Sequence, residues 1–144
     1  MSASQKQAGF SLVELLIVVA VIAIVAAIAI PGLMAARRSS NQSAAMQNLR
    51  NLGSAELTHH ALHASYTDFA GMKAAALIDQ AWTAGDARTG YVYADTTETG
   101  EEFFFAADPE STGAGTDFYG VEEDCIIRKG TVTLTEGAGV PIGT

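Results

Sequence analysis

The sequence predicts an α+β fold, in which one long N-terminal α-helix packs on a small antiparallel sheet of about four strands. Residues 12–30 hold 13 Leu, Ile or Val, five Ala and one Glu, which favours a helix that spans a membrane. The helical spacing of apolar residues then continues to about residue 66, so the second half of this helix is expected to be amphipathic. From Gly90 onward the spacing shifts towards two, which is typical of strands.

The composition and charge of the chain exclude several classes of protein. A length of 144 residues allows one modest domain, and a hydrophobic content of 49% is too high for a disordered chain. Residues 1–67 have a formal charge of +2 and residues 68–144 a charge of −10, which gives the total of −8. This acidic C-terminal part offers no clear nucleic-acid site, because affinity for phosphates comes mainly from Lys and Arg. The single cysteine, Cys125, cannot form a disulfide within the chain.

The apolar segment Leu12–Ile30 has the length of a membrane span. As a helix it would rise roughly 28 Å, close to the ~30 Å hydrocarbon core of a bilayer. Its large aliphatic side chains favour insertion by roughly 4–8 kcal/mol, and Glu14 opposes insertion by at most about 3 kcal/mol. The alternatives are a plain single-pass anchor and a cleaved secretory signal peptide, for which Ala27-Ile28-Ala29 resembles a cleavage site.

The residues just before this segment need a separate explanation. Ser11 and Glu14 have the spacing of a capping box, in which two side chains satisfy free backbone N–H groups at a helix start. Capping accounts for Glu14, but not for its combination with Gly9, Phe10 and the basic Lys6 in front of a span. A carboxylate in hydrocarbon is costly unless it is neutralised or paired, and the cation at hand is an N-terminal amine.

The start of the chain resembles the N-terminal signature of type IV pilins and the related pseudopilins, over residues 9–24 (GFSLVELLIVVAVIAI) and 26–31 (AAIAIP). The resemblance implies that prepilin peptidase cleaves between Gly9 and Phe10 and that the new amine of Phe10 is N-methylated. It also implies that Glu14 pairs with the amine of a neighbouring subunit during assembly. The sequence departs from the family pattern at Ala23, where many pilins have a helix-loosening Gly.

The resemblance divides the chain into three parts. Residues 1–9 are expected to be a cleaved leader peptide, residues 10–66 the long helix, and residues 67–144 a globular head, in the arrangement of the pilin fold. Pro31 and Gly32 lie within the helix, and we expect a kink there, because Pro lacks a backbone N–H and clashes with the preceding turn. Kinking at this point is also what the resemblance implies.

Beyond Pro31 the helix is expected to have a polar and an apolar side. A helical projection places one polar stripe on its outer side, made of Gln47, Asn51, Ser54, Thr58 and Ser65. On the opposite side it places Ala45, Leu49, Leu52, Glu56, His60 and His63. We expect the first three of these residues to pack on the head.

Two groups of side chains raise the question of a metal. His59 and His63 have a spacing that can chelate a transition metal, but the motif lacks the Glu of H-E-x-x-H and a clear fourth ligand. An ion pair between Glu56 and His60 is the simpler interpretation. A calcium site is the other hypothesis, based on Asp108, Glu110, Asp117, Glu122, Glu123 and Asp124, but these acids do not match a calcium-loop spacing. We expect no metal and no cofactor.

The head is expected to combine one short helix with antiparallel hairpins. The helix is predicted over Gly71–Gly85. The strands are predicted over Gly90–Thr96, Glu101–Ala107, Asp117–Val121 and Asp124–Lys129, with turns at Glu98-Thr99-Gly100 and Glu122-Glu123 and a fifth short strand over Thr131–Thr135. Gly137–Thr144 is expected to be loose, and Cys125 is expected to be a buried strand residue.

The pattern of motifs predicts a structural protein and no enzyme. The chain lacks G-x-S-x-G, Walker A, C-x-x-C and H-E-x-x-H motifs. The resemblance implies a subunit of a type IV pilus, which leaves the bacterial inner membrane and polymerises through its hydrophobic helix into an extracellular filament. Its implied partners are further copies, other pilins or pseudopilins, prepilin peptidase and an inner-membrane assembly platform. The alternatives are a pseudopilin of a type II secretion system and a membrane-anchored or secreted binding domain.

Overall fold

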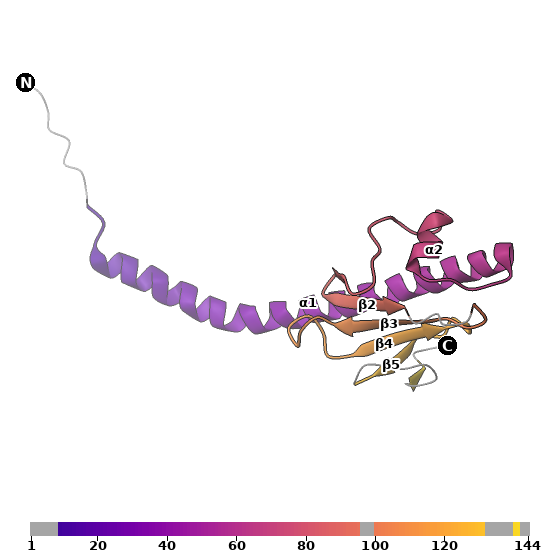
Figure 1. Ribbon diagram of the computed structural model, residues 1–144. Coiled ribbons are helices and arrows are strands. Elements are labelled where there is room, and N and C mark those ends of the chain that lie inside the picture. Colours follow the sequence, from indigo (N-terminus) through magenta and orange to yellow (C-terminus); the bar gives the residue numbers. More distant parts are fainter. Residues whose placement is uncertain (1–8, 96–99, 132–139, 142–144) are drawn as a thin grey trace, which may run out of the picture. The chain divides into compact units, whose positions relative to one another are not determined.

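The computed structural model describes residues 9–95, 100–131 and 140–141 (Figure 1). The chain falls into two compact units, Met1–Ala35 and Ala36–Thr144. In chain order the elements are α1 (Leu12–His63), α2 (Phe69–Ala74), β1 (Ala87–Arg88), β2 (Tyr91–Asp95), β3 (Phe104–Pro109), β4 (Phe118–Glu122), β5 (Arg128–Gly130) and β6 (Val140–Pro141). The fold is α+β, with a long N-terminal helix and an antiparallel sheet, as the sequence predicts.

Helix α1 starts at one half of the predicted capping box. The backbone N–H of Ser11 donates to the carboxylate of Glu14 (2.9 Å), and the backbone N–H of Leu15 donates to the Ser11 carbonyl (3.3 Å). The helix then continues without interruption through Pro31 to His63, close to the predicted range of 10–66. The kink at Pro31 and Gly32 stays a prediction.

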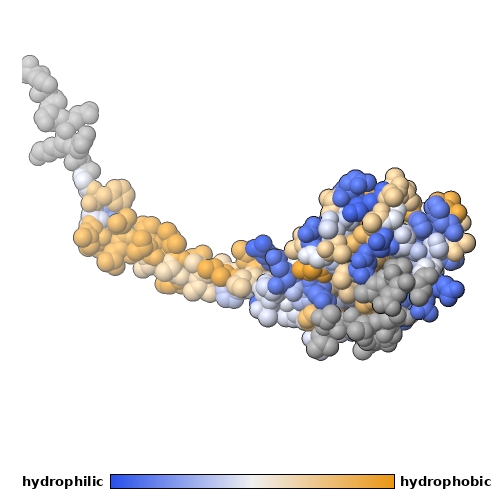
Figure 2. All heavy atoms as spheres, viewed as in Figure 1, coloured by the Kyte–Doolittle hydropathy of each residue, from blue (hydrophilic) through white to orange (hydrophobic). Residues whose placement is uncertain are grey.

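In the first unit the apolar side chains of α1 are exposed. Leu12 and Ile28 each expose 77% of their surface, and no part of the most apolar 18-residue stretch is buried. Figure 2 shows these residues as a continuous apolar surface on the face in view. By length and composition the helix can cross a membrane. The first unit therefore has a surface that suits lipid or other apolar helices, and not water.

In the second unit one face of α1 covers the sheet (Figure 1). Ala45, Leu49 and Leu52 are buried in a core together with strand residues such as Tyr93 and Phe105, which confirms the prediction for the apolar side of the helix. The members of the polar stripe that remain exposed are Gln47, Asn51, Ser54 and Thr58. Ser65 is half-buried in the turn after the helix.

The sheet has more strands than the sequence predicts. Its six described strands follow the order β1-β2-β3-β4-β5-β6, and every neighbouring pair is antiparallel. The two predicted hairpins form its centre, with β2 paired to β3 and β4 paired to β5. The prediction of about four strands missed β1 and β6, because two residues are too few to show an alternating pattern.

The ends of two predicted strands are displaced by local turn chemistry. Strand β3 begins at Phe104 and leaves Glu101 in a loop. The segment from Asp124 was predicted as strand but forms a turn, in which the Asp124 carboxylate accepts the Ile126 backbone N–H (2.8 Å). Cys125 lies in this turn with φ 55° and is half-buried, so its prediction as a buried strand residue is wrong. Strand β5 follows only at Arg128.

Helix α2 is shorter than the predicted helix over Gly71–Gly85. It starts at Phe69, because the Asp68 carboxylate caps it by accepting the Gly71 backbone N–H (2.8 Å). It ends after Ala74, and Ala76 then adopts a left-handed conformation with φ 56°. Two apolar residues of the predicted range, Met72 and Trp82, are nevertheless buried in the core.

Three predictions concern segments that lie partly outside the described residues. Of the predicted strand Thr131–Thr135 only residue 131 is described, and it is in a bend. Of the predicted turn at 98–100 only Gly100 is described, with φ 72°. Of the segment Gly137–Thr144, which was predicted to be loose, Val140–Pro141 pairs with β5 as strand β6, so the prediction is wrong for these two residues.

Candidate functional site

The predicted cleavage point lies immediately before α1 and is accessible. Gly9 and Phe10 precede the helix without regular secondary structure, and Phe10 exposes 87% of its surface. An exposed backbone without regular secondary structure is what a peptidase needs around a scissile bond. The cleavage between these residues and the methylation of Phe10 stay predictions.

Glu14 is exposed near the start of the helix, four residues after Phe10. Its carboxylate accepts one hydrogen bond from the Ser11 backbone N–H, and a negative charge at this end is favoured by the helix dipole. A carboxylate offers about four lone-pair sites, so the bond to Ser11 leaves room for a cation. Capping and pairing with an amine are therefore compatible in geometry.

Glu56 is the buried carboxylate of the second unit. It is completely shielded from solvent, its Oε1 accepts the backbone N–H of Thr67, and its Oε2 is buried without a hydrogen-bond partner among the described residues. Burial raises the pKa of Glu56, and the Thr67 N–H and His59 oppose this effect. The predicted ion pair with His60 does not form, since His60 is exposed and its ring stacks on Tyr66 at 4.4 Å.

The three histidines complete the end of α1. The Nδ1–H of His59 donates to the Ser65 carbonyl (2.8 Å), and the Nδ1–H of His63 donates to the His59 carbonyl (3.2 Å). These two rings stack face to face with 4.3 Å between centroids. Because the lone pairs of an imidazole lie in its ring plane, two stacked rings do not point at one ion. Among the residues that the structure describes, no group of three or more metal-binding side chains lies together.

Three of the six acidic side chains proposed as calcium ligands, Asp117, Glu122 and Asp124, form ion pairs with cationic side chains. Arg128 lies 3.1 Å from Glu122 and 2.6 Å from Asp124, and its hydrogen bonds lower the pKa of Asp124. The ammonium of Lys129 lies 2.9 Å from the carboxylate of Asp117. These ion pairs explain three of the acids as partners of Arg128 and Lys129, which both lie in strand β5.

Sequence reasoning missed the role of Glu56. The helical projection placed it on the buried side of α1, and a charged residue on that side was the signal that it would need a partner from the head. The partner is a backbone N–H in the turn between α1 and α2, and a backbone group carries no sequence signature. The link between Arg128 and two acids was missed for a related reason, because the turn at Asp124 was predicted as strand.

Comparison with curated proteins gave no significant match. Comparison with models of protein families matched residues 4–30 to the prokaryotic N-terminal methylation motif. The matched segment includes the exposed Gly9 and Phe10, the capping carboxylate of Glu14 and the apolar part of α1 up to Ile30. Together with that exposed helix, it indicates that the precursor is anchored in a membrane. The chain therefore carries the N-terminal signature of type IV pilins and pseudopilins, which are structural proteins that prepilin peptidase processes and that assemble with one another.

Proposed function

We propose that this protein is a structural subunit of a type IV pilus, which polymerises through the apolar part of α1 into an extracellular filament. The observation that carries the proposal is the continuity of the methylation motif with a fully exposed apolar helix that contains one carboxylate, Glu14. A lipid anchor alone does not require that carboxylate, and its cost in hydrocarbon needs a compensating cation.

The proposed assembly step follows from this charge. Cleavage after Gly9 creates a new amine on Phe10, and Glu14 lies one helical turn further along the chain. A subunit in the bilayer whose Glu14 lacks a cation carries an uncompensated charge, so it gains by placing Glu14 beside the amine of a neighbouring subunit. Such pairing fixes the axial register of adjacent helices, while the exposed aliphatic side chains supply the contact area.

The proposed partners are those that the subunit meets between the inner membrane and the filament. Prepilin peptidase removes residues 1–9 at the inner membrane and methylates Phe10, and an assembly platform in the same membrane adds subunits to the growing filament. Further copies of the chain and other pilins are the neighbours within that filament. A pseudopilin of a type II secretion system carries the same signature, and a filament on the cell surface is the observation that separates the two.

The proposal is tested by analysis of the protein from its native cells. Intact mass and N-terminal sequencing are expected to give a chain that starts at a methylated Phe10, and electron microscopy is expected to show surface filaments that contain it. A chain that retains Met1, or one that starts near Ile30, would contradict processing by prepilin peptidase. Correct processing without surface filaments would favour the pseudopilin.

A further inference from the structure

In the second unit, two neighbouring basic side chains of α1 have no acidic partner in the part of the chain that the structure describes. Arg37 is exposed and Arg38 is half-buried, and neither has a carboxylate within ion-pair distance among the described residues. The Nε of Arg38 is buried and has no hydrogen-bond acceptor in that part of the chain. We call these two residues the basic end. Arg88, Arg128 and Lys129 each have a carboxylate within 4.0 Å, whereas Arg50 and Lys73 have none among the described residues.

Exposed acidic side chains that form no ion pair within 4.0 Å among the described residues lie at the other end of this unit. Glu101 and Glu102 are exposed and follow Gly100, whose carbonyl accepts the backbone N–H of Tyr66 just beyond α1 (2.8 Å). Glu123 is exposed as well. The pKa of the same Tyr66 is raised first by the burial of its own ring and second by the negative charge of Glu123. We call Glu101, Glu102 and Glu123 the acidic end.

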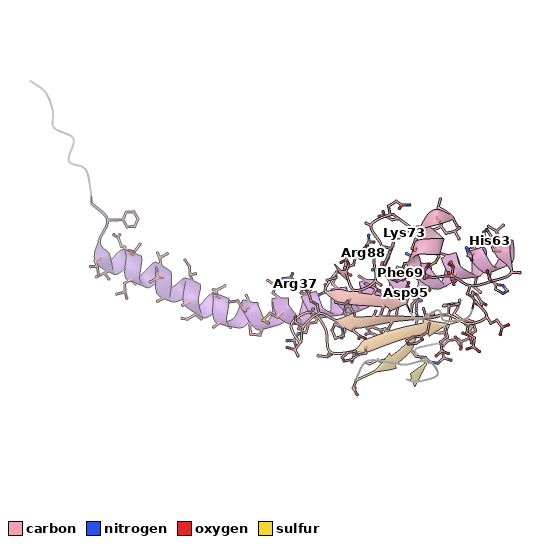
Figure 3. All side chains as sticks on the ribbon, viewed as in Figure 1. Arg37, His63, Phe69, Lys73, Arg88 and Asp95 are labelled. Atoms are coloured by element: carbon pink, nitrogen blue, oxygen red, sulfur yellow. The ribbon has the colours of Figure 1, made fainter. Side chains whose placement is uncertain are left out.

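The two ends are too far apart to neutralise each other within one copy. Figure 3 labels Arg37 and His63, which lie near the two ends of this part of α1. From residue 38 to residue 63 the helix rises roughly 38 Å, at 1.5 Å per residue. The Debye length at physiological salt is about 8 Å, so an attraction over that distance is screened. Opposite charges at the two ends can pair only between copies.

We propose that the basic end of one copy binds the acidic end of a second copy, head to tail. The contact joins two different surfaces, so a pair of copies still offers one free surface of each kind, and repetition produces an open filament when the rotation between copies does not close a ring. This inference rests on the proposed function as far as the filament is concerned. The charge pairing adds specificity and association rate to the contacts of the apolar helices.

A cross-linking experiment tests the contact without relying on filaments. Two full-length variants are prepared in detergent, one with Arg38→Cys and the other with Glu102→Cys, and both also carry Cys125→Ser. The two variants are then mixed and oxidised. A mixed disulfide dimer is expected at low salt and is expected to disappear at about 1 M salt, where the Debye length is about 3 Å. Arg50→Cys in place of Arg38→Cys is the matched control, because Arg50 is exposed on the same helix outside the basic end. Equal yields from both pairs would overturn the inference.

Charge reversal tests the same contact during assembly in cells. The pairs Arg37→Glu/Arg38→Glu and Glu101→Arg/Glu102→Arg are each expected to reduce filament yield by about tenfold or more, because like charges then face each other. The four changes together are expected to restore filaments. The control Arg50→Glu/Lys73→Glu changes the net charge as much as the first pair and is expected to assemble normally.

Each outcome has a definite meaning. A failure of the fourfold variant to recover, with a normal control, would overturn the inference and point to lipid headgroups as the partner of the basic end. Normal filaments from both reversed pairs would overturn it as well. Absence of filaments in the wild type would contradict the proposed function, and the cross-linking result would still decide the inference.

Discussion

At the residue scale, Glu14 and Glu56 show how one side-chain type serves two purposes in two environments. Glu14 is exposed at the positive end of a helix dipole, where a carboxylate is favoured. Glu56 is buried, and only one of its oxygens has a hydrogen-bond partner among the described residues. It lies near the carboxylates of Asp68 and Asp95 as well as His59. The sequence was sufficient to predict the first situation from the spacing of Ser11 and Glu14. It was insufficient for the second, because the partner of Glu56 is a backbone group.

Substitution of Glu14 separates capping from assembly. Glu14→Gln keeps an oxygen that can accept the Ser11 N–H but removes the charge, whereas Glu14→Ala removes both. Both variants are expected to insert into the membrane and to lose filaments, with insertion measured by membrane fractionation and filaments by electron microscopy. If Glu14→Gln formed filaments like the wild type, the carboxylate would act as a helix cap only.

Glu56 is expected to make the stability of the head depend on pH. Burial raises its pKa in the folded state above the ordinary value of 4.5, so folding favours the protonated form. The stabilising effect of that proton is fully present below the unfolded pKa and is lost as the pH rises through the folded pKa. Glu56→Gln, which imitates the protonated form and keeps an acceptor for the Thr67 N–H, removes this dependence.

The test of Glu56 is thermal unfolding of the full chain in detergent at several pH values. Fluorescence of Trp82, the single tryptophan and a buried one, reports on the head. The stability of the wild type relative to Glu56→Gln is expected to fall as the pH rises above 4.5. A constant difference between the two proteins over that range would show that Glu56 has the same pKa in the folded and the unfolded state.

At the element scale, the sequence predicted those elements whose pattern extends over many residues. Helix α1 and the central strands β2, β3 and β4 follow from periodicity, and their predicted and observed ranges overlap closely. The errors lie at ends that single residues determine: Cys125 takes φ 55° in a turn, and Asp68 starts α2 earlier than predicted. A pattern averaged over a window does not detect a single turn or cap.

Helix α2 is expected to depend on its cap because it has only six residues. Asp68→Ala removes the acceptor for the Gly71 N–H and is expected to destabilise the head by about 1 kcal/mol. Asp68→Asn keeps an acceptor oxygen and is expected to stay close to the wild type. Urea unfolding followed by Trp82 fluorescence measures both. An equal loss in the two variants would mean that the charge of Asp68 matters, and not the cap.

At the scale of the whole molecule, the hydrophobic content of 49% is an average over two parts of the chain that differ in composition. The first unit exposes its apolar side chains, and the second buries Ala45, Leu49 and Leu52 against the sheet. The composition places the end of the apolar segment at Ile30, whereas the compact units divide after Ala35. Only the second unit has a core of its own, and every described residue of that core lies at Ala45 or beyond.

This division predicts that the head folds without the apolar segment. A chain that starts at Ala36 loses one Lys and one Glu, so its formal net charge stays −8, and a charge of this size favours solubility. We expect it to be soluble without detergent, with the same Trp82 fluorescence as the full chain, whereas the full chain needs detergent because its aliphatic side chains are exposed. Ultracentrifugation and fluorescence measure these properties. A truncated chain that unfolds would show that residues before Ala36 contribute to the core, and one that forms filaments would show that the apolar helix is dispensable for assembly.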